Sequence, residues 1–302
     1  MSLKYKQIQP PEGINTSKEH PLKEFSLLLL GVLLFIVVAI VSLSYAAHLL
    51  APFVPFSAEQ KMADLFAGQM HDRPRDQLAE QIAQEDAAVT RYLQSLADRL
   101  AMAQGLPDDM SITVHYIDDE TVNAFATLGG HVFFFRGLLE NIANENALAM
   151  VMAHEIAHIK YRHPIKSLGR AVITGTAIAV VSSAAGSNII GDVLGETGLL
   201  TALKFSREQE QQSDESALNV LAKIYGHVDG ANTLFEVLEQ AHQDTQQPPE
   251  FFSSHPHTDN RIDNIIAMAG KHNWPITGAI TPLPPQFSRW LADTDSTFIQ
   301  RP

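Results

Sequence analysis

Residues 144–164 read NENALAMVMAHEIAHIKYRHP, and their pattern predicts a helix. Four residues give the segment an apolar helical setting, namely Ala147, Leu148, Val151 and Met152. His154 and His158 are four residues apart, so they project from one face, one turn apart. Two neutral imidazoles at this spacing can bind one Zn²⁺ at about 2.0–2.1 Å. Glu155 is placed to take a proton from a water on that metal.

A catalytic zinc needs a third protein ligand and an open position. His163 lies five residues beyond His158 and, on a continuous helix, would face away from the metal. The alternative is a carboxylate from the later helical segment 206–225. That segment holds three candidates, Glu208, Glu210 and Glu215. Spacing alone does not separate a ligand among them from an ordinary solvated helix face.

An apolar run near the N-terminus predicts a membrane anchor over residues 25–47. Fifteen residues between Phe25 and Leu43 are Leu, Ile, Val or Phe, which favours insertion by roughly 5 to 9 kcal/mol. A cleaved signal peptide ending near Ser44-Tyr45-Ala46 is the alternative. The polar leader of residues 1–24 and the length of the run favour the retained anchor.

Basic residues flank this run unequally. Lys4, Lys6, Lys18 and Lys23 precede it, whereas Lys61 is the one basic residue among positions 51–70. Lysine and arginine are enriched on the cytoplasmic side of membrane spans. We therefore expect a single-pass protein of the inner (plasma) membrane, with a cytoplasmic N-terminus and with the rest outside, in the periplasm of a bacterium.

Composition excludes several classes of function. The formal net charge of −13 argues against a nucleic-acid partner, because phosphate binding needs a basic surface. The chain has no cysteine, so disulfides, thiolate metal ligands and cysteine nucleophiles are excluded.

Helical periodicity dominates after the anchor, with strands expected at 111–117 and 131–135. We expect an α+β fold, mainly α-helical, with one small sheet behind a single transmembrane helix. The expected domain covers residues 58–270, followed by a proline-rich tail at 271–302. The helix that contains His154 is expected to run from Asn144 to about His163, where Pro164 would stop it.

Residues 171–191 are uncharged and could be taken for a second span. They hold seven Leu, Ile, Val or Phe residues among Gly, Ser, Thr and Asn, so insertion is weaker than for the first run. One crossing there would place the two halves of the predicted site on opposite sides of the membrane. A mobile helical flap or a surface that touches lipid is the expectation.

Several motifs together resemble metallopeptidase family forty-eight. The stretch SREQEQQSD at 206–214 is similar to the family's Ser-Arg…Glu-x-x-Ala-Asp signature, and NAFATLGGHVF at 123–133 resembles its strand entry. HIKYRH at 158–163 resembles its His-x-x-x-Arg-His continuation. Leu128 and Ser213 depart from the usual Pro and Ala, but neither position supplies a reacting atom. The resemblance covers roughly residues 60–270 and implies a zincin fold of the gluzincin type.

The resemblance also implies roles for particular residues. Glu210 would be the third zinc ligand, and Asp214, one turn on, would orient a ligand histidine. His131, Val132 and Phe133 would lie on an edge strand that pairs with the backbone of an extended substrate. Core packing is the alternative for the phenylalanines of that strand.

His255 lies in a segment that resembles the family's Ser-Thr-His-Pro motif. The resemblance implies that it approaches the metal. There it would either stabilise the oxyanion of the tetrahedral intermediate or take the fourth zinc position and hold the enzyme inactive. A surface histidine that caps a turn is the third interpretation.

These observations predict a zinc endopeptidase with one Zn²⁺ per chain. Its substrates would be membrane or exported proteins in extended form, and its role would be in envelope quality control. The competing hypothesis is a membrane-tethered binding or chaperone-like factor whose zinc site is closed.

Overall fold

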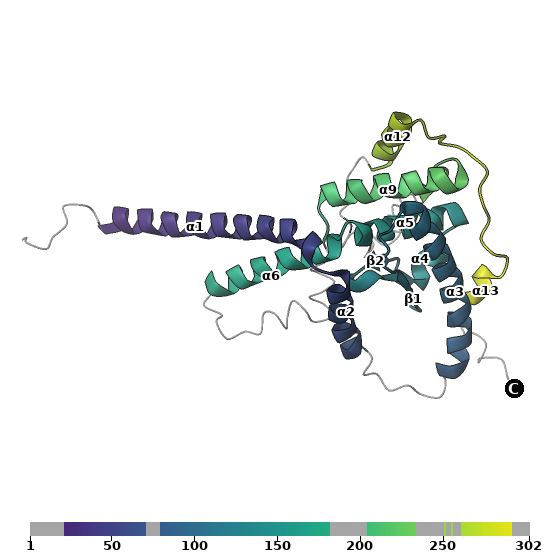
Figure 1. The fold of residues 1–302 in the computed structure, drawn as a ribbon, viewed down its shortest axis with the longest axis horizontal. Helices are drawn as coiled ribbons and strands as arrows, with labels where there is room; N and C mark the ends of the chain where they lie inside the picture. Colours follow the sequence, from purple (N-terminus) through teal and green to yellow (C-terminus); the bar gives the residue numbers. More distant parts are fainter. Residues whose placement is uncertain are drawn as a thin grey trace, which may run out of the picture.

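The computed structural model describes residues 21–70, 79–181, 204–233, 251, 255 and 261–291. Figure 1 shows a mostly helical body from which one long helix projects. In chain order the helical elements are α1 (Pro21–Leu50), η1 (Ala51–Phe53), α2 (Phe56–Met70), α3 (Ala79–Gln104), η2 (Leu128–Gly130), α4 (Arg136–Glu140), α5 (Glu145–Lys160), α6 (His163–Val181), α9 (Arg207–Tyr225), α12 (Arg261–His272) and α13 (Phe287–Trp290). The strands are β1 (Thr113–Ile117), β2 (Ala124–Ala126) and β3 (His131–Phe135). The expected α+β class, mainly helical with a small sheet, is confirmed.

The described sheet has the order β1-β3-β2. β3 pairs in parallel with β1, from Thr113 opposite His131 onward, and antiparallel with β2, where Phe125 lies opposite Phe133. The expectation that His131–Phe135 is an edge strand is therefore wrong, because β3 has a neighbour on each side. β2 was not expected as a strand, since three residues are too few to show alternation.

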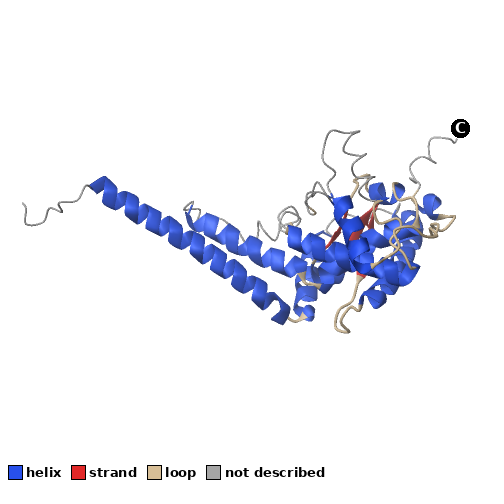
Figure 2. Cartoon of the chain, turned by 90° about the horizontal axis from the view of Figure 1, so that it is seen from above, coloured by secondary structure: helices blue, strands red, loops and turns tan. Residues whose placement is uncertain are grey.

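α5 is the centre of the fold. Every residue from Glu145 to Ile159 is buried, and α9 and α3 pack against this helix while β2 contacts it as well. Figure 2 shows the strands enclosed by helices. Asn144 begins α5 by accepting a hydrogen bond from the Ala147 N–H at 2.8 Å, a frequent N-cap arrangement. A helix buried on all sides must satisfy its polar side chains inside the protein.

The end of α5 differs from the expectation. The helix stops at Lys160 rather than near His163, and Arg162 adopts a left-handed backbone with φ of 61°. α6 then starts at His163, so Pro164 lies in the first turn of a new helix, where proline is well tolerated. One residue in the left-handed region thus redirects the chain and brings His163 back toward α5.

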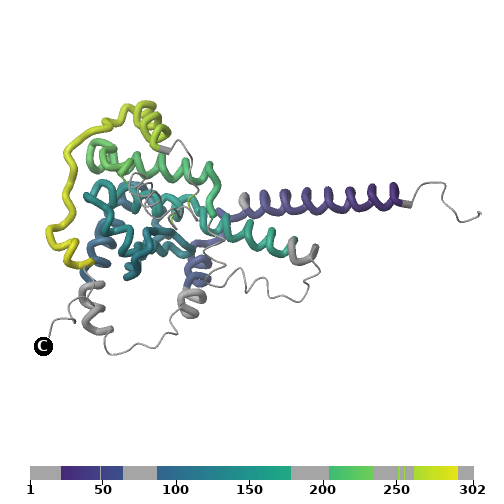
Figure 3. Tube along the Cα trace, turned by 180° about the vertical axis from the view of Figure 1, so that it is seen from behind, coloured from purple at the N-terminus to yellow at the C-terminus, as the bar shows by residue number. Residues whose placement is uncertain are grey.

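Residues beyond 270 also join the core. Figure 3 shows the chain from α12 running along one flank of the body to α13. Phe287 and Leu291 are buried with the main core residues, and the Phe287 ring meets Tyr92 of α3 edge-to-face at 5.6 Å. The packed core therefore extends past residue 270, where the sequence placed the end of the domain.

Arg162 also joins the end of α5 to the segment that follows α1. Its Nε donates to Glu59 Oε1 at 2.7 Å, and its Nη2 donates to the Val54 carbonyl at 2.7 Å. Both side chains of the ion pair are buried. Removing one partner of a buried pair leaves an unpaired charge in the core.

Glu59→Ala is therefore expected to lower the free energy of unfolding by roughly 3–5 kcal/mol. The midpoint of thermal unfolding of the full chain in detergent measures the change. Glu120→Ala is the matched control, because Glu120 is 86% exposed and 3.8 Å from Arg136, and its loss should be nearly neutral. Equal shifts in the two variants would contradict a structural role for the Glu59–Arg162 pair.

Candidate metal centre

His154 and His158 lie on consecutive turns of α5 and direct their rings to one point. The two Nε2 atoms are 3.0 Å apart. Both rings are buried, with relative exposures of 3% and 0%. The other nitrogen of each ring, Nδ1, faces away from this point and binds a separate partner.

Glu210 reaches the same point from α9. Ser206 and Gln209 form a capping box that fixes the start of α9, and Glu210 follows one residue later. Its Oε2 is 3.4 Å from His154 Nε2 and its Oε1 is 3.5 Å from His158 Nε2. Among the three candidate carboxylates the structure thus brings Glu210 to the histidines. Glu208 is exposed, and Glu215 pairs with His272 at 2.9 Å.

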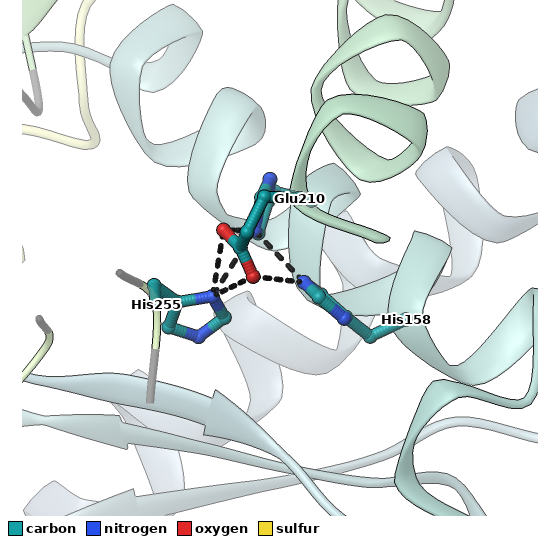
Figure 4. Close-up of side chains that lie close together, drawn as sticks. His158, Glu210 and His255 are labelled. Carbon is teal, nitrogen blue, oxygen red and sulfur yellow. Dashed lines mark hydrogen bonds and ion pairs between the residues drawn. The ribbon is translucent and has the colours of Figure 1, made fainter. Parts of the chain in front are cut away.

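His255 completes the group. Its Nδ1 lies 3.0 Å from Glu210 Oε1 and 3.3 Å from His154 Nε2. Figure 4 shows His158, Glu210 and His255 converging from different parts of the chain. The ring is fully buried and stacks on Phe251 with centroids 4.4 Å apart. A surface position for His255 is therefore excluded.

These four side chains suit a divalent cation. They are buried, and their ligand atoms lie within 4.8 Å of one another. The separations described above run from 3.0 to 3.5 Å. Ligands at 2.0–2.1 Å from a tetrahedral metal are about 3.3 Å apart, so the spacing fits tetrahedral coordination. Three imidazole nitrogens and one carboxylate form a donor set of the borderline type that transition metals prefer.

The pKa shifts of His154, His158 and Glu210 also favour a bound cation. Burial holds the pKa of His158 well below its usual value, so its lone pair is free to bind a metal. Burial alone would raise the pKa of Glu210, but the neighbouring His255 and His154 hold it well below the ordinary value. Burial likewise opposes charge on His154, yet Asp214 and Glu210 outweigh it and raise the pKa to about 9. Surroundings that stabilise a proton on His154 also favour a metal cation there.

Glu155 stands beside this group. It is fully buried, and its Oε2 accepts a hydrogen bond from the Ala126 N–H of β2 at 2.8 Å. Its Oε1 lies 3.4 Å from His255 Nε2. Among the described residues, Glu155 Oε1 and His255 Nε2 have no hydrogen-bond partner. Burial raises the pKa of Glu155, which moves the carboxylate toward the range where it can accept and return a proton.

A further layer of contacts orients the two α5 histidines. Asp214, one turn beyond Glu210, has its Oδ1 2.9 Å from His154 Nδ1. His163 has its Nδ1 3.0 Å from His158 Nδ1, and its Nε2 is 3.1 Å from Gln212 Oε1. Burial lowers the pKa of His163 to about 4, so the ring is neutral. Such partners fix the tautomer and angle of a metal-binding imidazole.

The contact between His163 and His158 was missed by the sequence analysis. The expectation that His163 faces away assumed one continuous helix, and that assumption is wrong because α5 ends at Lys160. The feature of the sequence that could have predicted the break between the two helices is the pair His163-Pro164. Proline is favoured in the first turn of a helix, so Pro164 is compatible with a helix that starts there as well as with one that stops.

The residues proposed to bind substrate lie in the sheet next to Glu155. His131 Nδ1 is 2.8 Å from His115 Nε2 of β1, and Val132 is buried in the core. The Phe133 ring stacks between His115 and Phe125, with centroids 4.6 and 4.9 Å away. A backbone hydrogen bond to Glu155 comes from β2, through the Ala126 N–H.

Comparison with known proteins gives the family. Residues 87–269 match the profile of Peptidase family M48. The chain is similar to the mitochondrial metalloendopeptidase OMA1 of Schizosaccharomyces pombe, with 32% identity over 179 residues, which are 58% of this chain and 52% of the relative. It is also similar to the putative beta-barrel assembly-enhancing protease of Vibrio cholerae, with 28% identity over 198 residues, 62% of this chain and 40% of the relative.

The beta-barrel assembly-enhancing protease of Escherichia coli K12 is 28% identical over 193 residues, 59% of this chain and 38% of the relative. The chain thus spans about half the length, or less, of these relatives. The matched region contains all four side chains of the buried group and Glu155. From this match we conclude that the chain belongs to peptidase family M48.

Proposed function

We propose that the chain is a membrane-anchored zinc endopeptidase. The observation that carries this proposal is the buried group of His154, His158, Glu210 and His255 with Glu155 beside it. Nitrogen and oxygen donors at tetrahedral spacing suit zinc. His154, His158 and Glu210 would be its protein ligands, which leaves one corner for the reaction.

When bound there, zinc would act as a Lewis acid and lower the pKa of water to about 7. Glu155 would take the proton from the attacking water and pass it to the leaving amine. Its Oε2 is held by the Ala126 N–H, so Oε1 is the atom that carries the proton. Asp214 and His163 would orient the ligand histidines. Each of these side chains is held by packing before substrate arrives.

β2 is the better candidate for the substrate-pairing strand. Phe125 faces Phe133 in the ladder, while the Ala126 N–H points away from β3 toward Glu155. Alternate residues of a strand point their backbone groups to opposite sides, so the backbone groups of Ala124 and Ala126 point away from β3. An extended peptide added along this side would run past Glu155 by strand addition.

The anchor is proposed to be α1. Among the described residues it is the one helix long and apolar enough to cross a membrane. The lysines before it favour a cytoplasmic N-terminus and a catalytic domain on the outer face of the inner membrane. The names of the relatives, a mitochondrial metalloendopeptidase and beta-barrel assembly-enhancing proteases, support membrane or exported proteins as substrates, in envelope quality control.

The position of His255 favours a resting form of the enzyme. Its Nδ1 takes the fourth corner of the ligand group, where substrate or water would bind. Its other ring nitrogen faces Glu155, the proposed base. This closed arrangement also supports the second candidate function, a tethered binding factor with a weakly active site.

Glu155→Gln tests the enzyme proposal. Hydrolysis of an unfolded, fluorescently labelled protein by the full chain in detergent should fall at least about 100-fold, because amide replaces the proton carrier. Zinc content should stay unchanged, since Glu155 is not a proposed ligand. Equal proteolysis by the variant and the wild type would refute the proposed base.

Glu210→Gln tests the third ligand. The wild-type chain should hold about one zinc per chain by elemental analysis, and the variant should lose most of it on dialysis against a weak chelator. Glu208→Gln is the matched control, because Glu208 lies two positions earlier on the same helix and is exposed. Loss of zinc from both variants, or from neither, would contradict the assignment.

His255→Ala separates the two roles of the fourth corner. If His255 holds the enzyme inactive, hydrolysis of the unfolded protein should rise several-fold. A fall would instead assign His255 to oxyanion stabilisation. His227→Ala is a control, because that buried histidine binds the Ala279 carbonyl away from the metal centre.

A further inference from the structure

α6 runs back along α1 instead of covering the catalytic body. Gly169 lies against Ala47, where an added Cβ would be 3.5 Å from the alanine methyl group. Further along, residues 172–177 of α6 and residues 35–43 of α1 line one apolar groove. The two helices are therefore antiparallel neighbours. Figures 1 and 2 both show α6 beside α1, projecting from the body with it.

The surface of this pair is suited to hydrocarbon. The described apolar side chains of α1 are largely exposed, Phe35 by 72% for example. Thr176 contributes the one polar side chain to the groove, and its Oγ1 donates to the Val172 carbonyl at 2.7 Å. A hydroxyl bonded to its own helix needs no water. Residues 171–181 carry no charge.

Positive charge gathers where the apolar part of α6 begins. Lys166 and Arg170 lie in its first two turns, and Arg170 Nη2 donates to the Lys204 carbonyl at 3.0 Å. Arg170 and Lys204 are exposed. Gly169, which lies between Lys166 and Arg170 in the sequence, packs on Ala47, and Lys166 Nζ donates to the Tyr161 carbonyl at 2.7 Å. The net charge of the whole chain is −13. A local basic group bordering an apolar surface complements the phosphates of phospholipids.

The helix pair is joined firmly to the catalytic body. Ala51 and Phe56, just after α1, are buried, and Arg162 binds both Glu59 and the Val54 carbonyl. α1 is thus not a loose tether. α6 lies beside α1, and α5 ends at Lys160, shortly before α6 begins at His163. The position of α1 therefore also fixes the position of α5.

We propose that residues 171–181 of α6 insert into the same bilayer that α1 crosses, from the side of the catalytic domain, with phospholipid chains filling the α1–α6 groove. The inference rests on the proposed crossing by α1. At 1.5 Å per residue this segment is roughly 16 Å long, about half of the ~30 Å hydrocarbon core. α6 therefore enters one leaflet without crossing. Of the two expectations for this segment, lipid contact is the one that the packing favours.

Because the chain has no cysteine, single-cysteine variants of the full protein test the inference directly. Thr176→Cys reports on α6, Val38→Cys on α1, and Met102→Cys on an exposed position of the body, where the side chain is 83% accessible. Each is labelled with bimane and reconstituted in phospholipid vesicles. Fluorescence is measured with spin-labelled phospholipids in the bilayer and, separately, with iodide in the water.

We expect lipid quenching at Thr176→Cys to be comparable to that at Val38→Cys and several-fold greater than that at Met102→Cys. Iodide should quench Met102→Cys several-fold more than either of the other two variants. Lipid quenching at Val38→Cys together with iodide quenching at Thr176→Cys would overturn the insertion of α6 and leave the anchor intact. Protection of Thr176→Cys from both quenchers would show that protein, not lipid, fills the groove. Iodide quenching at both α1 and α6 would overturn the anchor itself.

Discussion

The contact of the Glu210 carboxylate with two imidazoles of α5 is the constraint on which the rest of the fold depends. α5 is buried along nearly its whole length, so its polar side chains cannot turn to water and must find partners inside. α9 supplies Glu210 and Asp214 from adjacent turns. β2 supplies a backbone N–H to Glu155. The helices and the sheet must therefore pack in one arrangement for the buried charges to be satisfied.

Arg162 extends this constraint toward the membrane. Its left-handed backbone ends α5 and starts α6, while its guanidinium binds Glu59 of α2. Burial raises the pKa of Glu59 even beside this cation, so the pair recovers only part of the cost of removing its charges from water. Its main effect is orientation, because it fixes the ends of α1 and α6 relative to α5.

The expectations that failed have a common physical origin. β3 lies inside the sheet because β1 and β2 pair with it on either side. Periodicity within one segment does not show which other segments pair with it. The contact between His163 and His158 depends on one backbone torsion at Arg162. A change of φ at a single residue leaves the apolar pattern unchanged, so helical spacing alone predicted a continuous helix.

Local pattern in the sequence was enough for α1, for α5 apart from its end, and for placing His154 and His158 on one face, because each depends on spacing within one segment. Glu210 was one of three carboxylates by spacing, and resemblance to a family singled it out. Only the tertiary structure decided that His255 takes the fourth corner of the buried group, that β2 contacts Glu155 and that α6 lies along α1. These features join segments far apart in the chain, and packing in three dimensions, not periodicity, sets which of them meet.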